Sequence, residues 1–166
     1  RRGLWSLASL AVEERRLTPL QVPYTDISSL RCDGHQAAFL AGSPTEPLSV
    51  IRLDLESGLP EILRRSTPLA IDPEYFTRPE PIEFPTAGGR TAHAIFYPPR
   101  NPVFAAPDAE RPPLVVMSHG GPTAATSTTL RLHIQFYTSR GIAVLDVNYG
   151  GSTGYGRAYR ERLYGQ

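Results

Sequence analysis

One histidine, two glycines and a proline, His119-Gly120-Gly121-Pro122, directly follow the apolar run Leu114–Ser118. Because glycine has no Cβ, the backbone N–H groups of such a loop can approach a ligand closely. A donor aimed at the oxygen of an acyl-transfer intermediate lowers the reaction barrier by about 3–4 kcal/mol. The N–H of Gly121 is therefore a candidate oxyanion donor, although a glycine pair after a strand more commonly forms only a tight turn.

The elements on either side of this loop have to hold it in place. Residues 114–118 and 142–147 are apolar except for Ser118 and Asp146, and these runs predict two strands buried on both faces of a parallel sheet. Apolar residues at positions i, i+4 and i+7 predict a helix over residues 127–139, ended by Gly141. The three elements form a strand–helix–strand crossover, which places the loop at the carboxyl end of the first strand.

The amino-terminal part of the chain has a different pattern. Residues 80–97 predict two strands joined by a turn at 86–89, and residues 98–113 form a proline-rich loop. Before them, short strand-like runs alternate with turn residues, and the runs 4–7 and 50–53 lie 46 positions apart. A repeat of about 40–50 residues built of strands is typical of a β-propeller blade, but it also fits a generic antiparallel β-module.

Composition excludes several functions for the 166 residues. The net charge is +1 and the arginines form no cluster, so neither a nucleic acid nor a membrane surface is an expected partner. No run approaches the roughly 18 apolar residues of a membrane span. Cys32 is the single cysteine, which favours a reducing, cytoplasmic location. His35, His93 and His133 show no metal-ligand spacing, so neither a metal nor another cofactor is expected.

Residues 114–122 and 141–156 together resemble the prolyl oligopeptidase family of serine peptidases, in particular its acylaminoacyl-peptidase and dipeptidyl-aminopeptidase branches. The resemblance implies an α/β fold in which the start of an α/β-hydrolase sheet is preceded by antiparallel β-propeller blades. Residues 1–70 would be the end of the propeller. Residues 71–166 would be the amino-terminal part of the catalytic domain, truncated before the nucleophile.

The resemblance also implies roles for particular residues. Gly121 would donate its N–H to the oxyanion, and His119 would belong to the same loop, either as a ring donor or as a hydrogen-bonded structural histidine. Tyr149 and Tyr155 would lie in an active-site wall and bind substrate. Where the family usually has an arginine, this chain has Gly150, so a guanidinium that would order this wall is missing.

Residues 150–154 spell G-x-S-x-G, the pattern of a nucleophile elbow, with Ser152 at its centre. Only 12 residues follow Gly154, and neither Asp nor His is among them, so the partners of a catalytic triad could not follow this serine. We therefore expect the triad beyond Gln166 and expect the fragment itself to be inactive.

The predicted function is hydrolysis of short peptides through an acyl-enzyme, by oligopeptidase action or by release of aminoacyl or dipeptidyl units. A short peptide is the expected partner, and oligomerisation remains possible, because unpaired hydrophobic strand edges favour association. Two alternatives stay open. The protein could be an esterase or lipase of the α/β-hydrolase class, or a non-catalytic propeller scaffold with a degenerate hydrolase domain.

Overall fold

The structure is a computed structural model that describes residues 3–68, 70–121 and 123–165. Its chain divides into two compact units, a helix-containing unit and an all-β unit. The helix-containing unit comprises residues 1–3, 70–127 and 131–166, and the all-β unit comprises residues 4–69 and 128–130.

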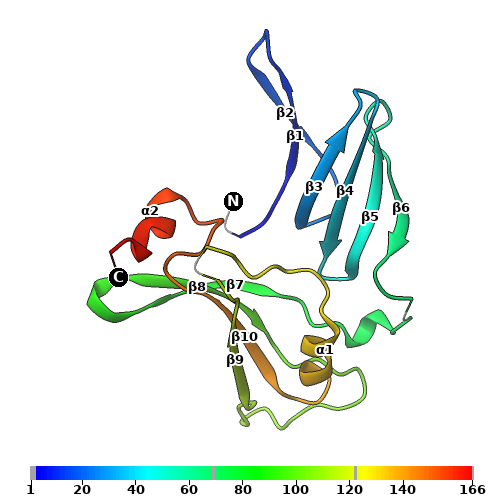
Figure 1. The fold of residues 1–166 in the computed structure, drawn as a ribbon. Helices are drawn as coiled ribbons and strands as arrows, with labels where there is room; N and C mark the ends of the chain where they lie inside the picture. The colour runs from blue at the N-terminus through cyan, green and yellow to red at the C-terminus, as the bar shows by residue number, and fades with distance from the viewer. Residues whose placement is uncertain (1–2, 69, 122, 166) are drawn as a thin grey trace. The chain divides into compact units, whose positions relative to one another are not determined.

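The all-β unit contains a two-stranded sheet, β1-β2, and a four-stranded antiparallel sheet with the order β3-β4-β5-β6 (Figure 1). Along β4 and β5 alternate side chains are buried, so Phe39, Ile51 and Leu53 belong to one core with Leu7 of β1. The strands are β1 (Leu7–Ala11), β2 (Arg16–Leu20), β3 (Asp26–Cys32), β4 (Gln36–Ser43), β5 (Glu46–Asp54) and β6 (Pro60–Arg65).

Two hairpins recur in this unit, β1-β2 and β5-β6, but the predicted spacing of 46 residues is wrong. The hairpin turns begin at Val12 and Leu55, which are 43 positions apart. A shift of 46 carries Leu7, the first residue of β1, onto Leu53 near the end of β5. Apolar residues repeat every second position in these strands, so two similar runs can be aligned at more than one spacing. The similarity between the runs therefore did not give the correct spacing between the hairpins.

The helix-containing unit is built on a four-stranded sheet with the order β7-β8-β10-β9. The crossover was predicted correctly, because β9 and β10 are parallel neighbours joined through α1, while β7-β8 and β8-β10 are antiparallel. The turn over residues 86–89 is confirmed and uses positive φ angles at Gly88 and Gly89, of 69° and 68°. The strands are β7 (Glu80–Pro85), β8 (Thr91–Tyr97), β9 (Leu114–Ser118) and β10 (Ala143–Asn148).

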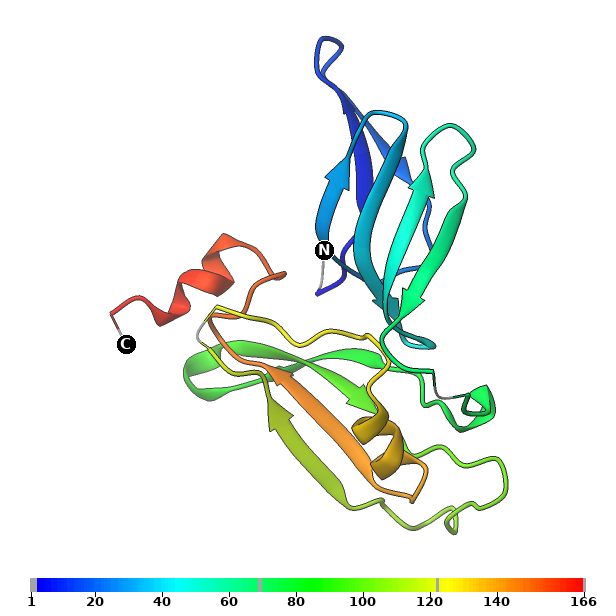
Figure 2. The same cartoon turned by 45° about the vertical axis from the view of Figure 1, so that its right-hand side comes forward.

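Helix α1 (Leu132–Thr138) covers one face of this sheet, as the turned view shows (Figure 2), and Ile134 packs there against Ile95, Tyr97 and Val144. The prediction that the first apolar run is buried on both faces is wrong. In β9, which is an edge strand, Leu114 and Val116 are 51% and 61% exposed on the face away from α1. The exposed apolar edge that we expected is thus present on β9.

Helix α1 is shorter than predicted, because it begins at Leu132 and not near residue 127. Residues 128–130 belong to the all-β unit, where Thr128 shares a hydroxyl hydrogen bond of 2.7 Å with Thr25. The N–H of Leu130 donates to the Ser43 carbonyl at 2.8 Å. These bonds satisfy groups that a helix would otherwise use, and β-branched threonines favour the extended form. In the part of the chain that the structure describes, no helix combines the length and apolarity needed to cross a membrane.

Gly42 is the position where the threonine segment contacts β4 most tightly. A Cβ on Gly42 would lie 2.5 Å from Cγ2 of Thr129. We therefore expect Gly42→Ala to lower the free energy of unfolding by about 1–3 kcal/mol, measured by urea denaturation. Adding Thr129→Ala, which removes the atoms nearest the new methyl group, should recover part of the loss. A Gly42→Ala variant with the free energy of unfolding of the wild type would contradict this close contact between Gly42 and Thr129.

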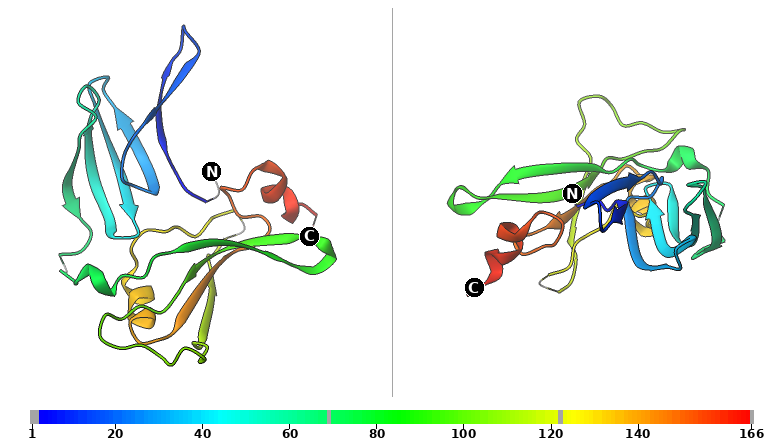
Figure 3. Two further views of the ribbon diagram at one scale, coloured as in Figure 1. Left: turned by 180° about the vertical axis from the view of Figure 1, so that it is seen from behind. Right: turned by 90° about the horizontal axis from the view of Figure 1, so that it is seen from above.

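In the view from behind (Figure 3), the β7-β8 hairpin and the α2 segment can both be followed within the helix-containing unit. The segment consists of α2 (Arg157–Arg160) and a 3-10 turn over Glu161–Leu163. Tyr159 of α2 is buried, and its hydroxyl donates to the Asn148 carbonyl at 2.6 Å. This bond ties the segment to the carboxyl end of β10.

Candidate active site

Two loops of the helix-containing unit meet at the carboxyl ends of β9 and β10. Because these strands are parallel neighbours, with Ser118 opposite Val147, the chain leaves both at the same edge of the sheet. Residues 119–121 follow β9 and residues 149–152 follow β10. In open α/β sheets, ligands bind outside the carboxyl ends of strands. Pro122, the last residue of the predicted motif, lies outside the described residues.

Gly121 has the backbone conformation that the oxyanion prediction needs. Its φ angle is +74°, in the left-handed region that favours glycine, and a Cβ there would meet no atom within 4 Å. Among the described residues, none accepts a hydrogen bond from the Gly121 N–H. This donor, on an exposed residue, can therefore bind a ligand oxygen without first breaking a bond to any of the described residues.

His119 lies against the second loop rather than pointing freely into solvent. Its Nε2 is 2.7 Å from Oγ of Ser152, and that hydroxyl is also 2.8 Å from the Tyr149 carbonyl oxygen. Its Nδ1 lies 3.3 Å from the Gly120 carbonyl oxygen and 3.4 Å from the Tyr149 hydroxyl. Both ring nitrogens therefore have hydrogen-bond partners within the two loops. The geometry supports a structural role for the His119 ring rather than ring donation to an oxyanion.

Burial argues against Ser152 as a nucleophile. Ser152 is fully buried, so a substrate carbonyl cannot reach its Oγ. The G-x-S-x-G pattern at residues 150–154 thus contains a structural serine, as the order of triad partners predicted.

Tyr149 holds the loop of residues 119–121 in place. Its hydroxyl donates to the Gly121 carbonyl at 2.5 Å, and its ring stacks on His119 with the ring centroids 4.5 Å apart. This residue was predicted to bind substrate. It is half-buried beside Gly121, so a substrate contact through the outer face of its ring stays a prediction.

Tyr155 lies in a different environment. Its ring stacks on His93, with centroids 4.1 Å apart and planes 6° apart, and it also contacts Tyr159. Its hydroxyl accepts a hydrogen bond of 3.1 Å from the Asn148 amide. Burial raises the pKa of this phenol, and the Asn148 hydrogen bond lowers it to a smaller extent. The substrate-binding role of Tyr155 stays a prediction, and its contacts make it part of the support beneath the loops.

His93 is half-buried in this aromatic group. Burial lowers the pKa of His93 from its ordinary 6.5, while nearby Glu83 raises it and Arg162 lowers it. The folded state therefore favours the neutral ring. Its contribution to stability is complete above the unfolded pKa of about 6.5 and is lost as the pH falls below that value.

We expect His93→Phe, which keeps an aromatic ring in the stack, to make stability less sensitive to acid. The urea midpoint of the wild-type protein should fall more between pH 8 and pH 5 than that of the variant, since only the wild type gains a buried charge. Equal losses in the two proteins would show that His93 does not contribute to the acid sensitivity.

A buried polar network below the two loops was not predicted as a unit. The Asn148 side chain, fully buried, accepts from the Thr126 N–H at 2.9 Å, and the Thr126 hydroxyl donates to Asp146. Asp146 is also paired with Arg131 at 2.9 Å, so both of its contacts are structural. The sequence contained one indication of this network. Asp146 and Asn148 are two positions apart, so both side chains lie on one face of β10.

The missing arginine at position 150 has a structural counterpart. A Cβ on Gly150 would lie 3.3 Å from Cδ of Arg162, so the side chain of Arg162 runs beside the glycine. The Arg162 guanidinium donates to the Thr91 carbonyl at 2.6 Å and lies over the Tyr159 ring. An arginine at position 150 would compete with Arg162 for this space.

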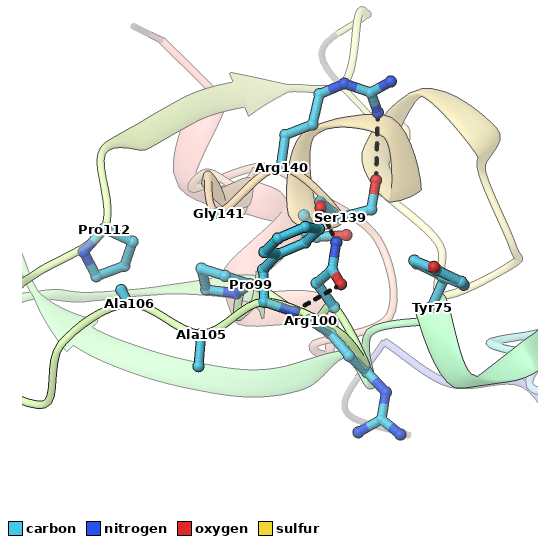
Figure 4. Close-up of a pocket in the computed structure, with 12 residues that line it drawn as sticks. Tyr75, Pro99, Arg100, Ala105, Ala106, Pro112, Ser139, Arg140 and Gly141 are labelled. Carbon is cyan, nitrogen blue, oxygen red and sulfur yellow. Dashed lines mark hydrogen bonds between the residues drawn. The ribbon is translucent and has the colours of Figure 1, made fainter.

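The helix-containing unit also has a cavity of about 990 Å³, lined by Tyr75, Phe104 and the carboxyl end of α1 (Figure 4). Pro112 and Gly141 line it too, and they precede β9 and β10, respectively. The loops of residues 119–121 and 149–152 follow the same two strands. The cavity therefore lies at the opposite end of the strand pair from the candidate active site.

Comparison with known proteins agrees with the resemblance in the sequence. Residues 128–166 match the model of the prolyl oligopeptidase family. The solved structure of a Mycobacterium tuberculosis puromycin-hydrolyzing peptidase is 46% identical over 98% of this chain and 25% of its own, with a TM-score of 0.93. The acylamino-acid-releasing enzyme of Rattus norvegicus is 45% identical over 64 residues, 39% of this chain and 8% of the enzyme. Dipeptidyl aminopeptidase BIII of Pseudoxanthomonas mexicana is 47% identical over 47 residues, 28% of this chain and 7% of that protein.

The chain spans 25% of the solved peptidase and 8% of the curated relative from rat. The family match includes the loop of residues 149–152 and α2, and the structural match covers both units. These matches support an assignment to the prolyl oligopeptidase family, whose model matches residues 128–166 of this chain.

Proposed function

We propose that the chain supplies the oxyanion-hole arm and the adjoining wall of a serine peptidase that hydrolyses short peptides through an acyl-enzyme. One observation carries the proposal: the Gly121 N–H has no acceptor among the described residues and lies on a loop braced by Tyr149. Such a preorganised donor binds an oxyanion without reorganising at the moment of reaction.

In the proposed reaction a serine hydroxyl attacks the carbonyl carbon of the scissile amide while a histidine takes its proton. The carbonyl π electrons move to oxygen, and the oxyanion accepts a hydrogen bond from the Gly121 N–H. Collapse of this intermediate expels the amine and leaves an acyl-enzyme, which water then hydrolyses. The serine, histidine and aspartate of the triad would come from outside residues 3–165.

The relatives support a peptide as the substrate. They include an acylamino-acid-releasing enzyme, a dipeptidyl aminopeptidase and a puromycin-hydrolyzing peptidase, whose names describe release of small units from an amide. We infer the same class of substrate here: a short peptide from which an aminoacyl or dipeptidyl unit is released. The esterase alternative is not favoured, since these relatives are named for cleaving peptides or aminoacyl compounds.

The proposed architecture has residues 1–70 as the end of a β-propeller and residues 71–166 as the start of an α/β-hydrolase domain. The antiparallel order β3-β4-β5-β6 supports the first assignment, and the parallel β9-β10 pair supports the second. A cytoplasmic location remains part of the proposal, because Cys32 is a free, exposed cysteine.

The test is turnover by the protein expressed from its complete reading frame. Puromycin and dipeptidyl p-nitroanilides are suitable substrates, and loss of turnover after treatment with a serine-directed fluorophosphonate is the expected result. The isolated chain of residues 1–166 should show no turnover. Absence of fluorophosphonate-sensitive turnover in the complete protein would overturn the proposal, as would turnover by the isolated chain.

A further inference from the structure

Ser152 contacts the His119 ring and the Tyr149 backbone. Its Oγ lies 2.7 Å from Nε2 of His119 and 2.8 Å from the Tyr149 carbonyl oxygen. Its N–H donates to the same carbonyl at 3.0 Å. Because Ser152 is fully buried, water cannot replace these bonds. One small side chain thus fixes the position of His119 relative to Tyr149.

The two rings transmit this constraint to the glycine. His119 and Tyr149 stack at 4.5 Å, so the plane of the His119 ring limits how the Tyr149 ring can rotate. The Tyr149 hydroxyl then holds the Gly121 carbonyl at 2.5 Å. With that carbonyl fixed and φ at +74°, the direction of the Gly121 N–H is set. The contacts run continuously from Ser152 to the candidate oxyanion donor.

We propose that Ser152 is a positioning residue of the oxyanion-hole loop: it holds the His119 ring in place and, through the His119–Tyr149 stack, aims the Gly121 N–H at the reacting carbonyl. This inference rests on the function proposed above. In this proposal, the serine of the G-x-S-x-G pattern orients a donor that stabilises the transition state, and it does not attack the substrate.

The kinetic test uses Ser152→Ala and Ser152→Thr in the complete protein. Misdirection of an oxyanion donor affects the transition state more than the bound substrate, so Ser152→Ala should lower kcat about 10- to 100-fold and change KM less than about two-fold. Ser152→Thr, which retains the hydroxyl, should restore part of kcat. A wild-type kcat in Ser152→Ala would overturn the proposal.

Ser49→Ala is the matched control. Ser49 is also buried, and its hydroxyl donates to the Pro47 carbonyl at 2.8 Å, but it lies in β5 of the all-β unit. The control loses the same kind of hydrogen bond without touching the loop, so its kcat should match wild type. An equal fall of kcat in Ser49→Ala and Ser152→Ala would assign the effect to general destabilisation and overturn the proposal.

A second variant tests the route through Tyr149. Tyr149→Phe keeps the stacked ring and removes the bond to the Gly121 carbonyl. If Ser152 acts through Tyr149, the double variant should lose little more kcat than the more impaired single variant. Fully additive losses would show that Ser152 and Tyr149 act independently and would contradict the proposed route.

Nitrogen NMR of the His119 ring separates this inference from the proposed function. In protein labelled with ¹⁵N-histidine, Ser152→Ala should shift the ring nitrogen signals of His119, because Nε2 loses its partner, and Ser49→Ala should leave them in place. Unchanged His119 signals in Ser152→Ala overturn the positioning role, whatever the activity. A wild-type protein with no fluorophosphonate-sensitive turnover would instead overturn the proposed peptidase function.

Discussion

We expect the replacement of Gly121 with alanine to lower kcat for peptide hydrolysis by the complete protein about 100-fold, the effect of losing one oxyanion donor. The φ angle of +74° is unfavourable for alanine by about 1–2 kcal/mol, so the backbone turns to relieve it. This rotation moves the N–H away from the reacting oxygen. A Cβ would meet no atom within 4 Å, so the loss comes from the donor and not from a clash with neighbouring residues.

Gly89→Ala is the control for the Gly121 variant. Gly89 has a φ angle of +68° and equally open surroundings, but it lies in the β7-β8 turn. The two variants carry the same kind of backbone strain and should lose similar stability in urea denaturation. Only Gly121→Ala should lose kcat. A normal kcat in Gly121→Ala, with stability lowered as in the control, would contradict the oxyanion assignment.

Replacing Asn148 with alanine has the largest expected effect on stability. The variant leaves the Thr126 N–H without its acceptor and removes the donor to Tyr155 in a fully buried position. A buried unsatisfied group costs about 1–3 kcal/mol, and the space left by the side chain adds to this. We expect the free energy of unfolding to fall by about 3 kcal/mol, measured by urea denaturation.

Asn101→Ala provides the comparison for Asn148→Ala. The Asn101 side chain also makes several bonds, to the N–H groups of Val103 and Phe104 and to the Ser139 carbonyl. Asn101 is only half-buried, and water can replace its lost bonds. The free energy of unfolding of Asn101→Ala should therefore be lower than that of the wild type by about 1 kcal/mol. Equal losses in the two variants would contradict the importance that we give to the buried network below the loops.

Much of the fold could be predicted from local patterns. The apolar runs before His119 and before Asn148 predicted β9 and β10, and the crossover rule made them parallel neighbours. The start of α1 could not be predicted in this way, because the Thr128–Thr25 bond joins residues 103 positions apart. The exposure of β9 was missed for a related reason. An apolar run predicts a strand, but it does not specify whether both faces of that strand are covered.

The roles of single residues in the candidate site could be predicted from the sequence, but the contacts between them could not. The glycine pair and the apolar run before it pointed to the Gly121 N–H, and the order of triad partners argued against Ser152. The bond between His119 and Ser152 could not be predicted, since it depends on the side-chain geometry of two loops joined by a parallel strand pair. The same holds for the stack of His93 on Tyr155, which joins β8 to the loop after β10.

The most direct test of the central claim is to identify the serine that becomes labelled. The complete protein is treated with a fluorophosphonate, digested and mapped by mass spectrometry. If this chain supplies an oxyanion arm and no nucleophile, a single adduct forms on a serine outside residues 1–166, and Ser118 and Ser152 remain unmodified. An adduct on Ser152, or no adduct on any serine, would contradict the claim.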